Sequence, residues 1–134
     1  MATRTESAYP EDWFQVALKD LKRVARCLED EDVDDAAFHL QQAVEKALKG
    51  YLLARGWSLR RIHNVDALLA DASEHDKSLK RYQQMCQRVA GYYIIERYPS
   101  FEEGPSLAEV QRAYQQAKQL ISRLRSRRHG RRGG

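Results

Sequence analysis

One stretch of this chain, residues 33–55, limits its fold more than any other part of the sequence. It reads VDDAAFHLQQAVEKALKGYLLAR, and its apolar residues recur at spacings of three and four. Such spacing places them on one broad face of an α-helix. Several are alanines, whose small side chains allow a neighbouring backbone to come close. We therefore predict a long central helix with these polar residues mostly off its apolar face: Asp34, Asp35, Gln41, Gln42, Glu45 and Lys49.

The same periodicity predicts four further helices, and no stretch shows the alternation of a strand. Their ranges are 10–28, 65–73, 78–97 and 106–124. Pro10 suits a first helical turn, Asn64 suits an N-cap, and Gly56 suits the left-handed position that closes a helix. Ser106 followed by Glu109 forms the pattern of a capping box. The predicted fold class is all-α, an antiparallel up-and-down bundle of four to five helices.

The chain has the size and composition of one soluble domain, with 134 residues, 43% hydrophobic and 31% charged. No apolar run approaches the roughly 20 residues that a bilayer requires, and the first residues lack the apolar core of a signal peptide. We therefore predict a cytoplasmic protein with no membrane partner. Cys27 and Cys86 lie inside predicted helices, where reduced, packed thiols are expected. The four histidines show no metal-ligand spacing, so no metal or other cofactor is predicted.

The net charge of +4 is concentrated at the C-terminus. Residues 123–134 hold six of the 23 basic residues and no acid, which leaves 17 basic against 19 acidic side chains elsewhere. The sequence therefore divides into a helical domain at 1–125 and a basic, disordered tail at 126–134. Such a tail can attract nucleic acid through salt-sensitive phosphate contacts. The alternative is a tail that only aids solubility.

Three parts of the chain together resemble the HEPN domain family. They are the run AAFHLQQAVEKALKGYLLARG, then His63 and Asn64 with the short leucine-rich helix after them, and finally GYYIIERYPS. The resemblance spans about residues 10–125. It implies a HEPN-like bundle of four or five helices that pairs as a homodimer and is often encoded beside a minimal nucleotidyltransferase. Some members are ribonuclease toxins, and others are suspected of binding nucleotides or RNA.

HEPN ribonucleases carry an arginine followed a few residues later by a histidine, near the start of the last core helix. Arginine can hold the scissile phosphate, and histidine can act as acid or base near neutral pH. The similar region of this chain contains Arg97, but positions 102–104, which should offer the histidine, read Glu-Glu-Gly. A match from Arg123 to His129 lies in the arginine-rich tail, where chance produces it. Arg97 alone remains a catalytic candidate.

The first candidates for binding a nucleotide or RNA lie along the polar border of the central helix: His39, Gln42 and Lys46. The resemblance implies a polar groove between subunits, where these side chains would contact a base or a phosphate. For His39 the alternative is a histidine that only forms a hydrogen bond at a helix interface.

The other candidates come from the helix that family members use near their groove: Arg88, Tyr92, Arg97 and Tyr98. Tyrosine rings offer flat faces on which a base can stack. The alternatives are core tyrosines whose hydroxyls reach water, and an ion pair between Glu96 and Arg97 that fixes the loop.

We therefore expect a HEPN-domain protein of a toxin–antitoxin module, with a minimal nucleotidyltransferase as partner and with nucleotide or RNA binding. Enzymatic activity is not expected, because the arginine–histidine motif is missing from its usual place. Two alternatives stay open: a metal-independent ribonuclease toxin acting as a homodimer, and a purely structural dimerisation module. The small-residue face of 33–55, together with surplus apolar helix surface, suggests a partner surface for the homodimer.

Overall fold

The computed structural model describes residues 6–58, 64–92 and 104–128. Every regular element within these residues is helical: α1 Pro10–Glu29, α2 Val33–Ala54, α3 Val65–Ser73, the 3-10 helix η1 Lys77–Tyr82, α4 Gln83–Ala90 and α6 Leu107–Ser126. The predicted all-α bundle is confirmed. None of the described helices combines the length and the apolarity needed to cross a bilayer.

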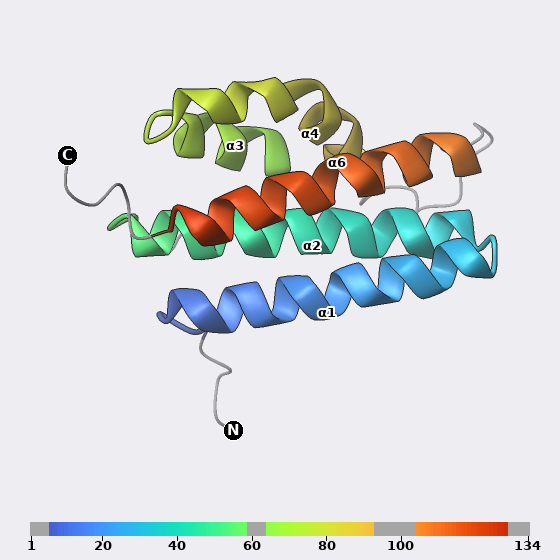
Figure 1. The fold of residues 1–134 in the computed structure, drawn as a ribbon, viewed down its shortest axis with the longest axis horizontal. Helices are drawn as coiled ribbons and strands as arrows, with labels where there is room; N and C mark the ends of the chain where they lie inside the picture. Colours follow the sequence, from blue (N-terminus) through green and yellow to red (C-terminus); the bar gives the residue numbers. More distant parts are fainter. Residues whose placement is uncertain (1–5, 59–63, 93–103, 129–134) are drawn as a thin grey trace.

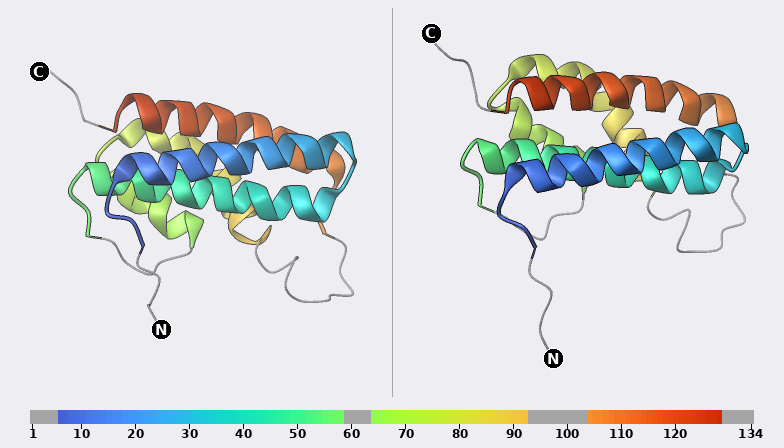
Figure 2. Two further views of the ribbon diagram at one scale, coloured as in Figure 1. Left: turned by 90° about the horizontal axis from the view of Figure 1, so that it is seen from below. Right: turned by 60° about the horizontal axis from the view of Figure 1, so that its bottom comes forward.

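Helix α2 lies at the centre of the bundle and contacts α1, α3, α4 and α6. Figure 1 shows α1 on one side of α2, with α6, α3 and α4 on the other. Helix α1 runs against α2, whereas α2 and α6 run in the same direction, so both end at the left of Figure 1. The views in Figure 2 show these three long helices side by side along the length of the molecule. Of the residues of α2, only Asp34 is exposed.

The helix limits follow the start and stop signals of the sequence. Pro10 is the first residue of α1. Asn64 caps α3, because its side-chain oxygen accepts a 2.9 Å hydrogen bond from the backbone N–H two residues later. Ser106 caps α6 in the same way, through a 3.1 Å bond from the N–H three residues later. Gly56, with φ at 90°, lies in the left-handed region after α2. These four predictions are confirmed.

The helix predicted at 78–97 begins as a different kind of helix. Residues Lys77–Tyr82 form η1, and the α-helical turns follow at Gln83–Ala90. Asp76 caps η1, since its Oδ1 accepts hydrogen bonds from the backbone N–H of Ser78 at 3.0 Å and from the Ser78 hydroxyl at 2.6 Å. This local bonding favours a tight first turn over an α-helical one. Residues 93–103, where the predicted helix was expected to end, lie outside the described residues.

Small residues form the contact between α2 and α1. Ala36, Ala43 and Ala47 are fully buried, and they share a helical stripe with Gly50. A Cβ added to Gly50 would lie 3.1 Å from the carbonyl oxygen of Pro10 and 3.2 Å from the ring of Phe14. The predicted close approach of a neighbouring backbone is therefore confirmed, and the neighbour is α1. Because α1 covers this face within the chain, it is not the partner surface that the sequence suggested.

Candidate functional site

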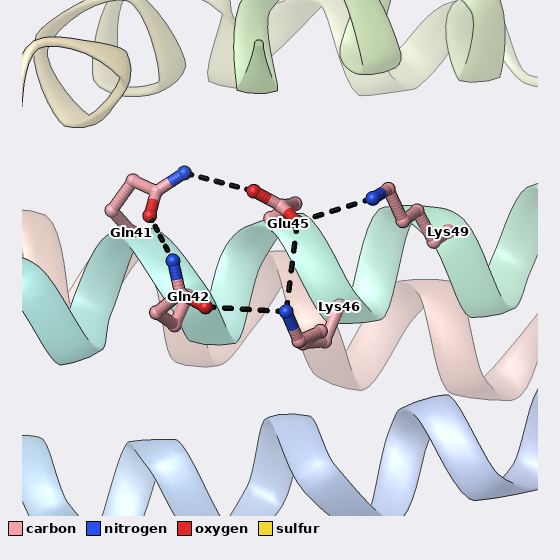
Figure 3. Close-up of polar contacts among 5 residues, drawn as sticks. All are labelled: Gln41, Gln42, Glu45, Lys46 and Lys49. Atoms are coloured by element: carbon pink, nitrogen blue, oxygen red, sulfur yellow. Dashed lines mark hydrogen bonds and ion pairs between the residues drawn. The ribbon is translucent and has the colours of Figure 1, made fainter. Parts of the chain in front are cut away.

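Five polar side chains of α2 contact one another along one side of the helix. We call them the α2 polar cluster: Gln41, Gln42, Glu45, Lys46 and Lys49. Figure 3 shows them between α1 below and α3 and α4 above, with α6 behind α2. Their spacing of one, three and four residues brings successive side chains within reach on a helix.

The contacts of the α2 polar cluster form a closed ring with one branch (Figure 3). The Gln41 amide donates to Glu45 Oε1 at 3.1 Å and accepts from the Gln42 amide at 2.7 Å. Lys46 Nζ donates to Gln42 Oε1 at 3.2 Å and lies 3.6 Å from Glu45 Oε2. Lys49 Nζ is the branch, 3.2 Å from the same Glu45 oxygen. The ring fixes the ammonium group of Lys46 from two sides.

Three members of the cluster are buried, although they lie off the apolar face of α2. Gln41, Glu45 and Lys49 are exposed by only 1%, 2% and 1%. Other helices surround α2, so positions off its apolar face also lie inside the molecule. Buried charges need a partner, because isolated charges lose their hydration without compensation. Glu45 and Lys49 compensate each other in this way.

Trp13 of α1 lies beside the two lysines of the cluster. Lys49 Nζ is 5.5 Å and Lys46 Nζ is 6.0 Å from the centre of the Trp13 ring, within the range of cation–π attraction. The indole N–H donates to the Ser7 carbonyl at 2.8 Å, which fixes the plane of the ring. Two lysines and one glutamate leave one surplus positive charge. The side chain of Lys46, 24% exposed, brings that charge to the surface.

The structure places His39 apart from this ring of contacts. Its Nδ1 lies 3.5 Å from Asp20 Oδ1 of α1, and the Arg23 guanidinium donates to the same oxygen at 3.0 Å. Asp20 is 4% exposed, so its carboxylate lies inside the contact between α1 and α2. His39 thus lies between the two helices, but its Nδ1 forms no hydrogen bond with the described residues, so the predicted interface hydrogen bond is not seen at this atom.

Arg88 lies in the last turn of α4, and Tyr92 follows that helix by two residues. The Tyr92 side chain is 5% exposed, and its hydroxyl has no hydrogen-bond partner in the described part of the chain. Burial raises the pKa of this hydroxyl, and the negative charge of Glu109 raises it further, against the opposing effect of Arg88. Arg88 itself is exposed. Arg97 and Tyr98, the remaining predicted residues, lie outside the described residues.

The predicted residues therefore separate into a pair in the α2 polar cluster, Gln42 and Lys46, and others that the structure places elsewhere. Sequence reasoning missed the partners that hold this pair, above all Glu45 and Trp13. The sequence did contain a signal for Glu45. Gln41, Glu45 and Lys49 follow one another at four-residue intervals, so they form a polar stripe on a helix with apolar residues on either side of that stripe. Among the described residues, no three histidine, cysteine, aspartate or glutamate side chains are grouped for a metal ion.

A family model, described as the HEPN domain, matches residues 10–127. The chain belongs to the HEPN domain family. One solved structure similar to this HEPN chain is TT1696 from Thermus thermophilus, with 27% sequence identity and a TM-score of 0.73 over 87% of this chain and 96% of that one. Another is ST0689, an archaeal HEPN homologue, with 21% identity and a TM-score of 0.70 over 90% and 98%. The second likeness concerns the fold alone. No curated protein matches this HEPN chain.

Proposed function

We propose that this HEPN protein binds a nucleotide or RNA on the polar side of α2, with Lys46 as the side chain that contacts phosphate. The observation that carries the proposal is the ring of contacts around the Lys46 ammonium group. Gln42 and Glu45 hold it at 3.2 and 3.6 Å, and the side chain still reaches the surface. A lysine held in place loses less conformational entropy when it binds an anion than a free surface lysine does.

The buried part of the cluster supports a binding role in a second way. Burying Glu45 and Lys49 adds little stability compared with apolar side chains of similar size. A buried ion pair that contributes so little stability is expected at a site where it holds other side chains in position. Here it positions Lys46, whose side chain reaches the surface.

We further propose that the protein acts as a homodimer in a toxin–antitoxin module with a minimal nucleotidyltransferase. The support is membership of the HEPN family together with the lack of a histidine at positions 102–104. A binding partner needs no catalytic pair. Light scattering of the purified protein, alone and with the nucleotidyltransferase encoded beside it, tests both parts of this proposal.

The binding site is tested by calorimetric titration with nucleoside mono- and triphosphates and with a short single-stranded RNA. Lys46→Met is expected to weaken binding by about tenfold or more, because a hydrogen bond to a charged group contributes about 1.5 kcal/mol or more. Lys22→Met is the matched control, since Lys22 is an exposed lysine of α1 outside the cluster.

Equal affinities for the two variants would contradict the site. Cleavage of the RNA during the titration would instead favour the ribonuclease alternative. Comparison with Arg97→Ala would then show whether Arg97 takes part. Absence of binding to every probe would favour the structural dimerisation module.

A further inference from the structure

Helices α2 and α6 both end at the same end of the bundle, and arginines gather there. Figure 1 shows the two C-terminal ends at the left, next to the turn that joins α3 to η1. We call the group the arginine end: Arg55 directly after α2, Asp76 of the turn, Arg123 of α6, and Arg127 directly after α6. It is distinct from the α2 polar cluster and includes none of its residues.

The arginine end is built on a buried tyrosine and a capping aspartate. The Arg55 guanidinium lies 5.8 Å from the ring centre of Tyr51, which is 1% exposed. Arg123 Nε lies 3.5 Å from Asp76 Oδ2, while the other carboxylate oxygen of Asp76 is engaged in capping η1. Arg127 is exposed, and Arg55 and Arg123 are partly exposed. The guanidinium groups of Arg55 and Arg123 thus have supported positions near the surface.

The charges at this end do not cancel. Three arginines lie near one aspartate, and the C-terminal ends of α2 and α6 each add about half a negative charge from the helix dipole. Together these offset about two of the three positive charges. A surplus positive charge of about one therefore remains on the residues of the arginine end.

The charges of the arginine end also act on Tyr51 and Asp76. Burial raises the pKa of Tyr51, Arg55 lowers it, Asp76 raises it, and Arg127 and Arg123 lower it. Burial would also raise the pKa of Asp76, but the hydrogen bonds from Ser78 and the charges of Arg123 and Arg127 lower it overall.

We propose that the arginine end is a second binding site, which takes a phosphate group through Arg55, Arg123 and Arg127 in competition with the Asp76 carboxylate. Arginine suits this role, since its planar guanidinium pairs with two phosphate oxygens at once. The phosphate belongs either to a nucleic-acid strand or to free phosphate. The site does not depend on the function proposed for Lys46.

The test measures binding of a fluorescent single-stranded oligonucleotide to the full chain across a range of salt concentrations. Arg127→Gln is expected to reduce the slope of log affinity against log salt by about 0.7, the contribution of one lost phosphate contact. Lys19→Gln, an equal change of charge at an exposed position of α1, is expected to leave the slope nearly unchanged. Among the described residues, Asp76 pairs with Arg123 rather than with Arg127, so the loss of Arg127 tests binding with little risk to the fold.

Asp76→Asn separates binding from a purely structural role. Asparagine keeps a side-chain oxygen for the cap of η1 but removes the competing negative charge. Affinity for the oligonucleotide is expected to increase. If the arginines serve only to offset the helix ends and Asp76, this variant does not bind more tightly.

Competition by inorganic phosphate, with sodium chloride at matched ionic strength, distinguishes the two phosphate sources. Phosphate binding that depends on Arg127, without oligonucleotide binding, identifies free phosphate as the ligand. Equal slopes for Arg127→Gln and Lys19→Gln, together with no gain for Asp76→Asn, would overturn the proposal. Lys46→Met is expected to leave the effect of Arg127→Gln unchanged, so failure of one site can be told from failure of the other.

Discussion

The two sides of α2 are both buried, yet they are built in opposite ways. Toward α1 the helix presents Ala36, Ala43, Ala47 and Gly50, which carry no polar side-chain atoms and let two backbones approach closely. Its polar cluster instead contains Glu45 and Lys49, two charges taken out of water. The first side stabilises the fold by packing. The second contributes little net stability and fixes a set of positions, which is the property expected of a binding site rather than of a core.

The largest expected effect comes from breaking the buried ion pair. Glu45→Ala leaves Lys49 buried without its charge partner, and we expect unfolding in urea to show a loss of about 3–5 kcal/mol. The double variant Glu45→Met with Lys49→Met should recover most of that stability, because apolar side chains of similar volume need no partner. A double variant as unstable as the single one would show that the polar side is also a stability element.

A smaller effect is expected on the side that faces α1. Gly50→Ala places a methyl group 3.1 Å from the Pro10 carbonyl oxygen, and overpacking of this kind costs about 1–3 kcal/mol. The higher helix propensity of alanine returns about 1 kcal/mol, so the net loss should be about 0–2 kcal/mol by urea unfolding. Gly91→Ala is the control, since its added Cβ meets the Arg88 carbonyl only at an ordinary 3.5 Å. Equal losses for both variants would contradict close packing at Gly50.

The ion pair of Asp76 with Arg123 sharpens the comparison, because it lies nearer the surface. The folded-state pKa of Asp76 is below the ordinary value of 3.8, so the unfolded chain takes up the proton first as pH falls. The stabilisation is therefore complete above pH 3.8 and is lost as pH falls through the folded-state pKa. Asp76→Asn should flatten this acid limb in unfolding curves measured at several pH values. An unchanged limb would contradict the assignment to Asp76.

The smallest effect is expected for Arg23, whose side chain is 56% exposed although its partner Asp20 is buried. Arg23→Ala should change the stability by about 1 kcal/mol, because the Arg23 guanidinium lies largely in water and His39 remains beside the buried Asp20 carboxylate. Thermal unfolding at low and high salt measures it, and a large, salt-independent loss would contradict a surface role. Asp20 retains its contact with His39 in this variant.

Much of the fold could be predicted from local signals. Pro10, Asn64, Gly56 and Ser106 act within one turn of their own positions, so the helix limits followed from short stretches of sequence. The periodicity of 33–55 likewise identified the central helix.

The candidate site depended on contacts that no local pattern encodes. Glu45 and Lys49 have the spacing of an exposed helical ion pair, and only the helices around α2 make them buried. The α1 contact with Lys46 through Trp13 joins residues far apart in the sequence. Lys46 and Gln42 were found because they border the apolar face, whereas the groups that hold them lie beyond it.

The close contact between α1 and α2 also has a kinetic consequence. These helices are consecutive in the chain and are joined only by residues 30–32, so their many contacts close a short loop. Such a hairpin can form early in folding and open last in the native state. We therefore expect the backbone amides of α1 and α2 to be the slowest to exchange with deuterium.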